Sequence, residues 1–261
     1  MGKDKKTKEK KTIASVIKAI EVIEFIAHSE KEVGVTEISN GLNYGVSATY
    51  HLLNTLKECN IVVQNERTKK YSLGLKLWQI GMLAYGQNHI SVTLKPYLER
   101  LKNLTGETAN LTVINNNQIV YIAQAESNRL VKMFTTMGAT APLHCTAGGK
   151  ALLAFKPEDV RKQILGEIEL TRYTENTITD KDEIIKELEE IRNKGYALDN
   201  EEREIGVSCI AAPVFDLNDN AIASITISGP TARFTDENKK KWIETVLQIA
   251  KEATDHLKTI N

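Results

Sequence analysis

The spacing of apolar and polar positions in segment 46–56 predicts an amphipathic helix with an unusual polar face. The polar face contains Ser47, Tyr50, His51 and Asn54, and the opposite face contains Thr49, Leu52, Leu53 and Leu56. No carboxylate occurs on the polar face. This composition suits a helix that enters the DNA major groove, where a carboxylate would be repelled by phosphates. Taken alone, the segment fits an ordinary surface helix equally well.

The segments before this helix favour DNA binding. Residues 36–42 predict a short helix with Thr36 as its N-cap and Glu37 in its first turn, and residues 43–45 predict a tight connection. Two helices joined by a short turn that contains Gly form a helix-turn-helix. An earlier helix should supply the core on which the pair packs, through the stripe Ile13, Val16, Ile17, Ile20, Ile23 and Ala27.

The segments after it predict a two-stranded wing. Residues 61–65 and 70–73 read as short strands around the turn 66–69, with basic side chains at or near the tip. Three helices and a basic hairpin predict a winged helix-turn-helix domain. We expect its DNA contacts to come from Thr36, Ser47, Tyr50, His51, Asn54, Arg67, Lys69 and Lys70.

The rest of the chain predicts an α+β domain, which follows a connecting helix. Segment 75–85 is helix-like and apolar on more than one side, so we expect it to be buried against its copy in a second subunit. A further helix starts near Leu94 and ends at Gly106. We expect strands at 108–114, 118–124, 131–135, 205–214 and 220–228, and helices at 149–155, 157–165, 181–194 and 236–257.

Composition and charge agree with this division. The chain has 261 residues, enough for two domains, and its net charge of zero combines two unlike halves. Residues 1–76 hold 13 Lys and Arg against 9 Asp and Glu, and the remainder holds 21 against 25. Much of the basic excess lies in the tail 1–11, which either adds non-specific attraction to phosphates or is a solvated leader. Without a membrane-length apolar run or a secretory signal, we expect a cytoplasmic protein.

The second domain offers groups suited to a small carboxylate. Gly148, Gly149 and Lys150 precede a predicted helix, whose free N–H groups favour an anion, but the phosphate-loop motif is absent. Thr226 and Ser228 are two residues apart on one predicted strand and therefore face the same way. Asp199 and Cys209 are further small polar groups on or beside strands, although each taken singly also fits a role in the core.

Three other functions were weighed against DNA binding. The pair His144 and Cys145 suggests a hydrolase, but adjacent residues rarely reach each other productively and no third partner is evident. A metal-dependent enzyme could use His144, Cys145, Cys209 and Asp199, although no spacing singles them out. With three cysteines and no CxxC pair, a disulfide framework and a Cys-rich zinc module are disfavoured. A protein-interaction adaptor would predict no salt-sensitive DNA binding.

Several longer motifs resemble the IclR-type bacterial transcriptional regulators. The resemblance covers residues from about Ile13 to about Leu257, and its most specific parts lie in the second domain. The motifs are the Ser-x-x-Tyr-x-Leu-Leu of the reading helix and the stretches 71–74, 142–144, 147–154, 195–202, 206–214 and 224–230.

The resemblance implies a winged helix-turn-helix domain joined by a linker helix to a GAF-like effector domain. The expected boundaries are a basic tail at 1–11, the DNA-binding domain at 12–74, the linker at 75–91 and the effector domain at 92–261. It further implies a homodimer or dimer of dimers on a palindromic double-stranded operator, without enzymatic activity or a cofactor. Repression is expected, with activation as the alternative.

The resemblance also implies which residues bind the effector, a small organic acid. They are Ala147, Gly148, Asp199, Cys209, Thr226 and Ser228. The chain departs from the family in two places: Arg is common where His51 stands, and Ser is frequent where Thr226 stands. The first departure affects how the helix contacts phosphate or guanine, and the second could narrow the pocket by one methyl group.

Overall fold

The computed structural model describes residues 12–87 and 89–260, so the predicted basic tail at 1–11 lies outside the described residues. The described residues form two compact units, one within residues 12–87 and the other within residues 89–260. None of the described helices has the length and apolar character needed to span a membrane.

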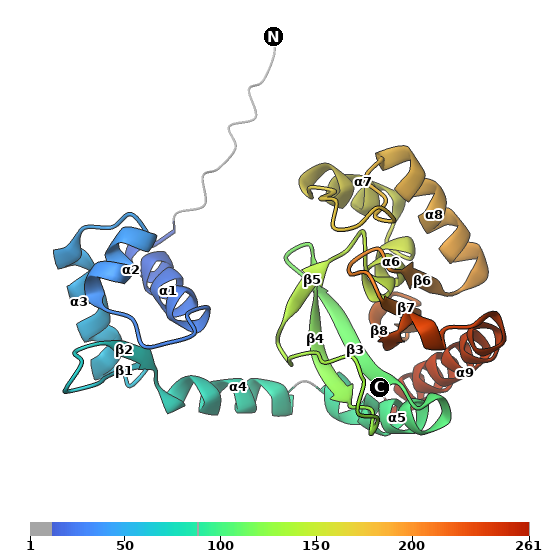
Figure 1. Cartoon of the computed structure of the whole chain (residues 1–261), viewed down its shortest axis with the longest axis horizontal. Helices are drawn as coiled ribbons and strands as arrows, with labels where there is room; N and C mark the ends of the chain where they lie inside the picture. Colours follow the sequence, from blue (N-terminus) through green and yellow to red (C-terminus); the bar gives the residue numbers. More distant parts are fainter. Residues whose placement is uncertain (1–11, 88, 261) are drawn as a thin grey trace, which may run out of the picture. The chain divides into compact units, whose positions relative to one another are not determined.

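The amino-terminal unit is a winged helix-turn-helix (Figure 1). Its elements in order are α1 (Ala14–Ala27), α2 (Val35–Gly41), α3 (Val46–Glu58), β1 (Val62–Gln64), β2 (Tyr71–Leu73) and α4 (Leu75–Gln87). The two strands pair antiparallel, with Val63 opposite Ser72. The buried core contains Val22, Ile26, Ile38, Leu53, Leu56, Val62 and Tyr71. The predicted fold of this part is therefore confirmed.

Two details of the sequence prediction for this unit were wrong. Helix α1 buries Val22 and Ile26, whereas most of the predicted stripe, including Ile17 and Ile20, is exposed. The helix is apolar on two sides, and periodicity alone could not tell which side the helix pair covers. Helix α2 has Gly34, and not Thr36, at its N-cap position.

The reason for the shifted helix start is the side chain of Glu37. Its carboxylate reaches back and accepts the backbone N–H of Gly34 at 2.5 Å, which satisfies one of the donors that a helix start leaves without a partner. Thr36 consequently lies within the first turn, with an exposed side chain.

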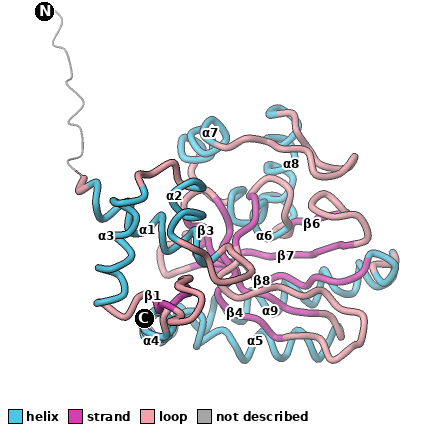
Figure 2. Tube along the Cα trace, turned by 60° about the vertical axis from the view of Figure 1, so that its left-hand side comes forward, coloured by secondary structure: helices cyan, strands magenta, loops and turns pink. Residues whose placement is uncertain are grey.

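The carboxy-terminal unit is a six-stranded antiparallel sheet between two layers of helices (Figure 1, Figure 2). The strands are β3 (Thr108–Asn115), β4 (Gln118–Ala125), β5 (Thr140–Pro142), β6 (Ala197–Asn200), β7 (Val207–Phe215) and β8 (Ala221–Pro230), in the spatial order β5-β4-β3-β8-β7-β6. Between β3 and β4, Asn116 and Asn117 take the left-handed conformation expected of the Asn-rich turn.

Each face of the sheet has its own hydrophobic core. Helices α5 (His89–Thr105) and α9 (Asp236–Ile260) cover one face, with Leu98 and Trp242 among the buried residues. Helices α6 (Ala147–Ala154), α7 (Glu158–Glu167) and α8 (Lys181–Lys194) lie on the other face, where Leu153 and Leu188 are buried. A short 3-10 helix, Thr231–Arg233, links β8 to the segment before α9.

The predicted strand at 131–135 is not formed. The edge position beside β4 is occupied by β5, with Ile119 opposite Ala141. Segment 126–139 instead forms no strand: its backbone bonds to β4 only near its end, where Gly138 and Ala139 bond to Tyr121, and the backbone oxygens of Val131 and Met133 accept hydrogen bonds from side chains. The segment is rich in β-branched and apolar residues, which is why the sequence predicted a strand, but it is a connecting loop. Its Phe134 is 72% exposed.

A buried carboxylate fixes this connection to the sheet. Glu107 is fully buried and pairs with Arg129 at 3.0 Å and with Arg233 at 2.6 Å. Arg233 also donates to the backbone oxygen of Val131 at 3.1 Å. Since two guanidinium groups compensate the buried charge, the cluster holds segment 126–139 over the sheet. This segment forms one wall of the cavity described next.

Candidate functional site

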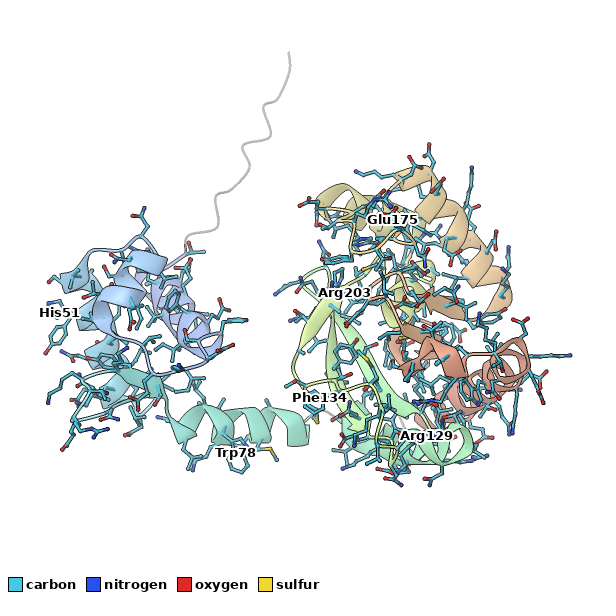
Figure 3. All side chains as sticks on the ribbon, in the orientation of Figure 1. His51, Trp78, Arg129, Phe134, Glu175 and Arg203 are labelled. Atoms are coloured by element: carbon cyan, nitrogen blue, oxygen red, sulfur yellow. The ribbon has the colours of Figure 1, made fainter. Side chains whose placement is uncertain are left out.

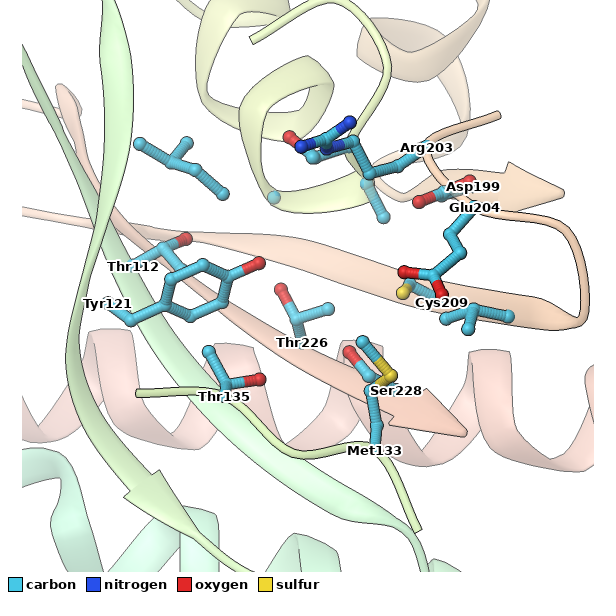
Figure 4. Close-up of a pocket in the computed structure, with 15 residues that line it drawn as sticks. Thr112, Tyr121, Met133, Thr135, Asp199, Arg203, Glu204, Cys209, Thr226 and Ser228 are labelled. Atoms are coloured by element: carbon cyan, nitrogen blue, oxygen red, sulfur yellow. The ribbon is translucent and has the colours of Figure 1, made fainter. Parts of the chain in front are cut away.

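A small cavity of about 50 Å³ lies in the carboxy-terminal unit, on the side of the sheet that carries α6 (Figure 4). The amino-terminal end of α6, the sheet, segment 126–139 and the loop after β6 enclose it. Six residues that the sequence identified as candidates all line this cavity, namely Ala147, Gly148, Asp199, Cys209, Thr226 and Ser228.

The strand register explains how residues far apart in the chain come together. Asp199 on β6 is the cross-strand partner of Cys209 on β7, and Cys209 is in turn the partner of Ser228 on β8. These three residues form one row across the sheet. Thr226 lies two positions from Ser228 and therefore on the same face, as the strand spacing predicted.

Glycine permits α6 to approach the sheet closely. A Cβ atom added at Gly148 would lie 2.8 Å from the hydroxyl oxygen of Thr112 and 2.9 Å from that of Ser224. Those distances are shorter than ordinary contacts, so no larger residue fits at this place. The start of the helix consequently lies directly against a group of hydroxyls on the sheet.

The amino-terminal end of α6 also provides backbone donors. Thr146 is the N-cap, and its hydroxyl accepts the N–H of Gly149 at 3.2 Å. The N–H groups of Ala147 and Gly148 belong to the same first turn and have no acceptor within the helix. Together with the positive end of the helix dipole, these groups favour an anion at this end of the cavity.

The hydroxyl of Thr226 is the most informative single atom of the cavity. The Thr226 side chain is only 5% exposed, and its Oγ1 atom has no hydrogen-bond partner among the described residues. A buried hydroxyl without a partner is unfavourable by roughly 1–3 kcal/mol. Its position in the wall of a cavity therefore points to a hydrogen bond with a molecule bound there.

Asp199 adds a titratable group to the cavity. Its pKa is raised to about 7, mainly by burial and also by the nearby Glu202 carboxylate, against the opposing effects of the Glu202 backbone N–H and of Lys150. The Asp199 Oδ1 atom accepts that N–H at 2.8 Å. Near neutral pH, Asp199 is therefore divided between its acidic and ionised forms.

Lys150, which sequence reasoning grouped with the glycines before it, does not point into the cavity. It is 1% exposed and pairs with Glu202 at 2.5 Å and with Glu187 at 3.2 Å. Its ammonium group is thereby committed to linking α6, α8 and the loop after β6. An anion in the cavity would be bound by backbone N–H groups and hydroxyls and not by this lysine.

The thiols near the cavity are poor nucleophiles. Burial raises the pKa of Cys145 to about 12, and burial likewise raises the pKa of Cys209 well above its usual value. Both are protonated at neutral pH, whereas a catalytic cysteine needs a thiolate. The Nε2–H group of His144 donates to the backbone oxygen of Thr171 at 3.0 Å and not to Cys145. Among the described residues, no three His, Cys, Asp or Glu side chains are grouped as a metal site.

Nine further residues line the cavity and were missed by the sequence reasoning. They are Thr112, Ile119, Tyr121, Met133, Thr135, Thr146, Arg203, Glu204 and Val207. Arg203 and Glu204 lie in the Glu-rich stretch 200–204, close to the predicted site residue Asp199. This closeness in sequence was the signal that could have identified them. The others come from strands and loops whose pairing the sequence does not reveal.

The second candidate site is the exposed face of α3. Ser47, Tyr50 and His51 are exposed and Asn54 is half-buried, whereas Thr49, Leu53 and Leu56 are buried. Figure 3 shows His51 projecting from α3 away from the rest of the amino-terminal unit. The two faces predicted from the sequence are therefore those of the folded helix.

The wing places its basic residues differently from one another. Arg67 and Lys69 are exposed at the turn, which Asn65 stabilises by accepting the backbone N–H of Arg67 at 3.0 Å. Lys70 is half-buried and pairs with Glu37 at 3.3 Å. Arg67 and Lys69 are thus free to meet a phosphate, while Lys70 would first have to leave its partner.

The family comparison covers both units. Residues 15–66 match the IclR helix-turn-helix domain, and residues 82–255 match the domain described as bacterial transcriptional regulator IclR C-terminal. The second match alone spans more than half of the chain.

Individual relatives agree with the family match. The chain is 35% identical over 250 residues to the HTH-type transcriptional regulator KdgR of Dickeya chrysanthemi, covering 96% of this chain and 82% of the relative. It is 31% identical to the HTH-type transcriptional repressor AllR of Salmonella typhimurium, covering 92% and 88%. The crystal structure of the Thermotoga maritima IclR is similar with a TM-score of 0.75 and 34% identity, covering 94% of this chain and 99% of that one.

The two relatives are named as a transcriptional regulator and a transcriptional repressor. The chain therefore belongs to the IclR family of bacterial transcriptional regulators, in which a DNA-binding helix-turn-helix domain precedes an effector-binding domain.

Proposed function

We propose that this regulator binds a small carboxylate in the cavity beside α6 and changes its operator affinity in response. The observation that carries the proposal is the Thr226 hydroxyl, which is buried without a partner next to the unsatisfied N–H groups of α6. A carboxylate oxygen can accept from both. Ala147 and Gly148 would supply N–H donors, while Ser228 and Cys209 would line the floor.

We propose further that the effector favours one arrangement of the protein over another. A ligand shifts an equilibrium only between states that it binds unequally. Since a relative at 31% identity is named a repressor, we infer that this chain represses transcription and that the acid alters operator affinity. We propose that the protein is located in the cytoplasm, because it acts on a DNA operator.

The α3 face and the wing are proposed as the DNA contacts. Ser47, Tyr50, His51 and Asn54 would reach base edges or nearby phosphates, and Thr36 lies exposed on the neighbouring helix α2. Arg67, Lys69 and Lys70 would contact the backbone or the minor groove.

A second copy of the chain is proposed as the partner of the exposed apolar faces in the amino-terminal unit. On α1, Ile13 is 68%, Val16 56%, Ile17 45% and Ile20 50% exposed, with the spacing of a helix-packing seam. On α4, Leu75 is 70% and Trp78 63% exposed (Figure 3). Apolar surface of this extent marks an interface, and a dimer on a palindromic operator would bury it. Pairing of two such dimers is the further possibility.

The first prediction separates base reading from phosphate contact. Asn54→Ala should weaken binding to the cognate operator by about 1–3 kcal/mol and leave random DNA little affected, since Asn pairs with adenine through two hydrogen bonds. Lys69→Ala is the control: it should weaken all sequences alike and lower the salt slope by about 1. Fluorescence anisotropy over a range of salt measures both. Equal losses on operator and random DNA for Asn54→Ala would show that Asn54 reads no base.

The second prediction concerns the effector. Thr226→Val keeps the side-chain shape and removes a hydroxyl without a protein partner, so the protein should stay folded and lose at least about tenfold in affinity for small carboxylates. Ser228→Ala should act in the same direction. Calorimetric titration against a carboxylate panel measures the affinities, with thermal unfolding as the check of folding.

Ser208→Ala serves as the matched control for the second prediction. Ser208 lies on β7, its hydroxyl bonds that of Thr231 at 2.9 Å, and it does not line the cavity, so its removal should leave carboxylate affinity nearly unchanged. A folded Thr226→Val protein that binds the acids as tightly as the native protein would contradict the assignment.

The third prediction is a pH dependence of effector binding. A carboxylate effector stays ionised above pH 6. Asp199, whose pKa is raised to about 7, is mostly neutral below pH 7 and mostly negative above it. Ionised Asp199 repels the anion. Between pH 6 and pH 8, affinity should therefore be highest at the acid end and should fall by up to about tenfold per pH unit above pH 7.

Asp199 is the group near the cavity to which we assign this pH dependence. Burial raises the pKa values of Cys145, Cys209 and Tyr121, so these three groups stay neutral across this range, and burial lowers the pKa of His144, which makes its protonation less favourable. Glu202 is paired with Lys150. Asp199→Asn should give an affinity that no longer varies between pH 6 and pH 8. Native affinity that rises with pH would refute the proposed role of Asp199.

The fourth prediction tests the interface between copies. Ile17→Glu places a charge in the exposed α1 seam and should shift the protein toward the monomer and weaken binding to DNA with two half-sites, while carboxylate binding remains. Leu217→Glu, at an exposed turn of the other unit, should change neither property. Sedimentation equilibrium gives the mass. An Ile17→Glu protein with the native mass would exclude α1 from the interface.

A further inference from the structure

The proposed function leaves two charged residues of the cavity unused, Arg203 and Glu204. Arg203 lines the cavity together with Asp199 and Glu204, on the loop between β6 and β7 (Figure 4). Thr112 and Tyr121 line the opposite wall, on β3 and β4. Arg203 supplies a positively charged side chain to a lining that otherwise consists of hydroxyls, apolar groups and carboxyls.

The Arg203 guanidinium is held in place without a carboxylate partner. Its central carbon lies 3.9 Å from the centre of the Tyr173 ring, a cation–π contact. Among residues 12–87 and 89–260, no ion pair engages it, in contrast to Arg129 and Arg233, which share Glu107. Its hydrogen-bond donors are therefore available to a molecule in the cavity.

The loop that carries Arg203 is fixed from several sides. The Glu202 backbone N–H is bound by Asp199, and the Glu202 side chain by the buried Lys150. On the outer side, the hydroxyl of Thr177 donates to the backbone oxygen of Glu202 at 2.6 Å. The same hydroxyl accepts the N–H of Tyr173 at 3.1 Å, which positions the ring under the guanidinium. The loop backbone beside Arg203 and the ring of Tyr173 are thus fixed before any ligand binds, and the exposed Arg203 side chain is positioned by its contact with that ring.

We propose that Arg203 determines effector specificity by binding a second carboxylate, an inference that rests on the proposed function. The effector would then be a dicarboxylic acid of about three to five carbons. One carboxylate lies at the start of α6 and on Thr226, and the other meets the guanidinium of Arg203. A planar guanidinium binds a carboxylate through two parallel hydrogen bonds, and it does so better when it is already fixed in place. The small cavity limits the length of the chain between the two acid groups.

Because Glu204 and Arg203 carry opposite charges, neutralising each of them should change the affinity for a second carboxylate in opposite directions. Glu204 neighbours Arg203 and also lines the cavity. If a second carboxylate binds here, removing the charge of Glu204 should strengthen binding and removing that of Arg203 should weaken it. An effector with a hydroxyl or an ammonium at this end would reverse or abolish these effects.

The experiment compares three pairs of acids matched in length by calorimetric titration of the full chain at pH 6.5. The pairs are malonate with propionate, succinate with butyrate, and glutarate with valerate. The native protein should bind at least one diacid about tenfold or more tightly than its monoacid partner. Arg203→Gln should weaken diacid binding far more than monoacid binding and so remove that preference, and Arg203→Lys should restore part of it. Glu204→Gln should increase it.

Two results would overturn the proposal. One is that no diacid binds the native protein more tightly than its monoacid partner, and the other is that Arg203→Gln keeps the preference. Failure of the proposed function itself looks different, because Thr226→Val would then leave monoacid and diacid binding unaltered. Monoacid binding that depends on Thr226 but not on Arg203, without a diacid preference, refutes the role of Arg203 alone.

Discussion

The close contact between α6 and the polar part of the sheet is the constraint on which the cavity depends. A short helix normally packs on a sheet through apolar side chains, but here its first turn lies against the hydroxyls of Thr112 and Ser224, at a distance that only glycine at 148 allows. The helix start therefore leaves backbone donors facing hydroxyls instead of a filled apolar core. We propose that this juxtaposition makes the carboxy-terminal domain a receptor for an anion.

The charged groups around the cavity follow from the same packing. Lys150 points from α6 to the other side, where burial makes its pairing with Glu202 necessary. Glu202 in turn lies on the loop that carries Asp199 and Arg203, so the loop is tied to the helix whose start would bind the carboxylate. A ligand that contacts Asp199 or Arg203 consequently contacts the same connected unit as one that contacts α6. We infer that occupancy of the cavity is sensed by this unit as a whole.

The sequence predicted a large part of this arrangement, because helix and strand spacing determine which side chains share a face. The helical repeat of about 3.6 residues gives the two faces of α3, and the two-residue repeat of a strand places Thr226 and Ser228 on one face. The buried side of α1 could not be obtained in that way, since the helix is apolar on two sides and only tertiary packing selects Val22 and Ile26. Segment 131–135 has strand composition but lies where β5 already occupies the edge. Arg203 was missed because its role depends on the ring of Tyr173, thirty positions earlier in the chain.

The central claim is that a carboxylate binds between the start of α6 and Thr226. Its most direct measurement is a crystal structure of the full chain with the small acid that raises its unfolding temperature most. We expect one carboxylate of that acid within hydrogen-bond distance of the N–H groups of Ala147 or Gly148 and of the Thr226 hydroxyl. An acid bound elsewhere on the protein, with the Thr226 hydroxyl still lacking a partner, would contradict the claim.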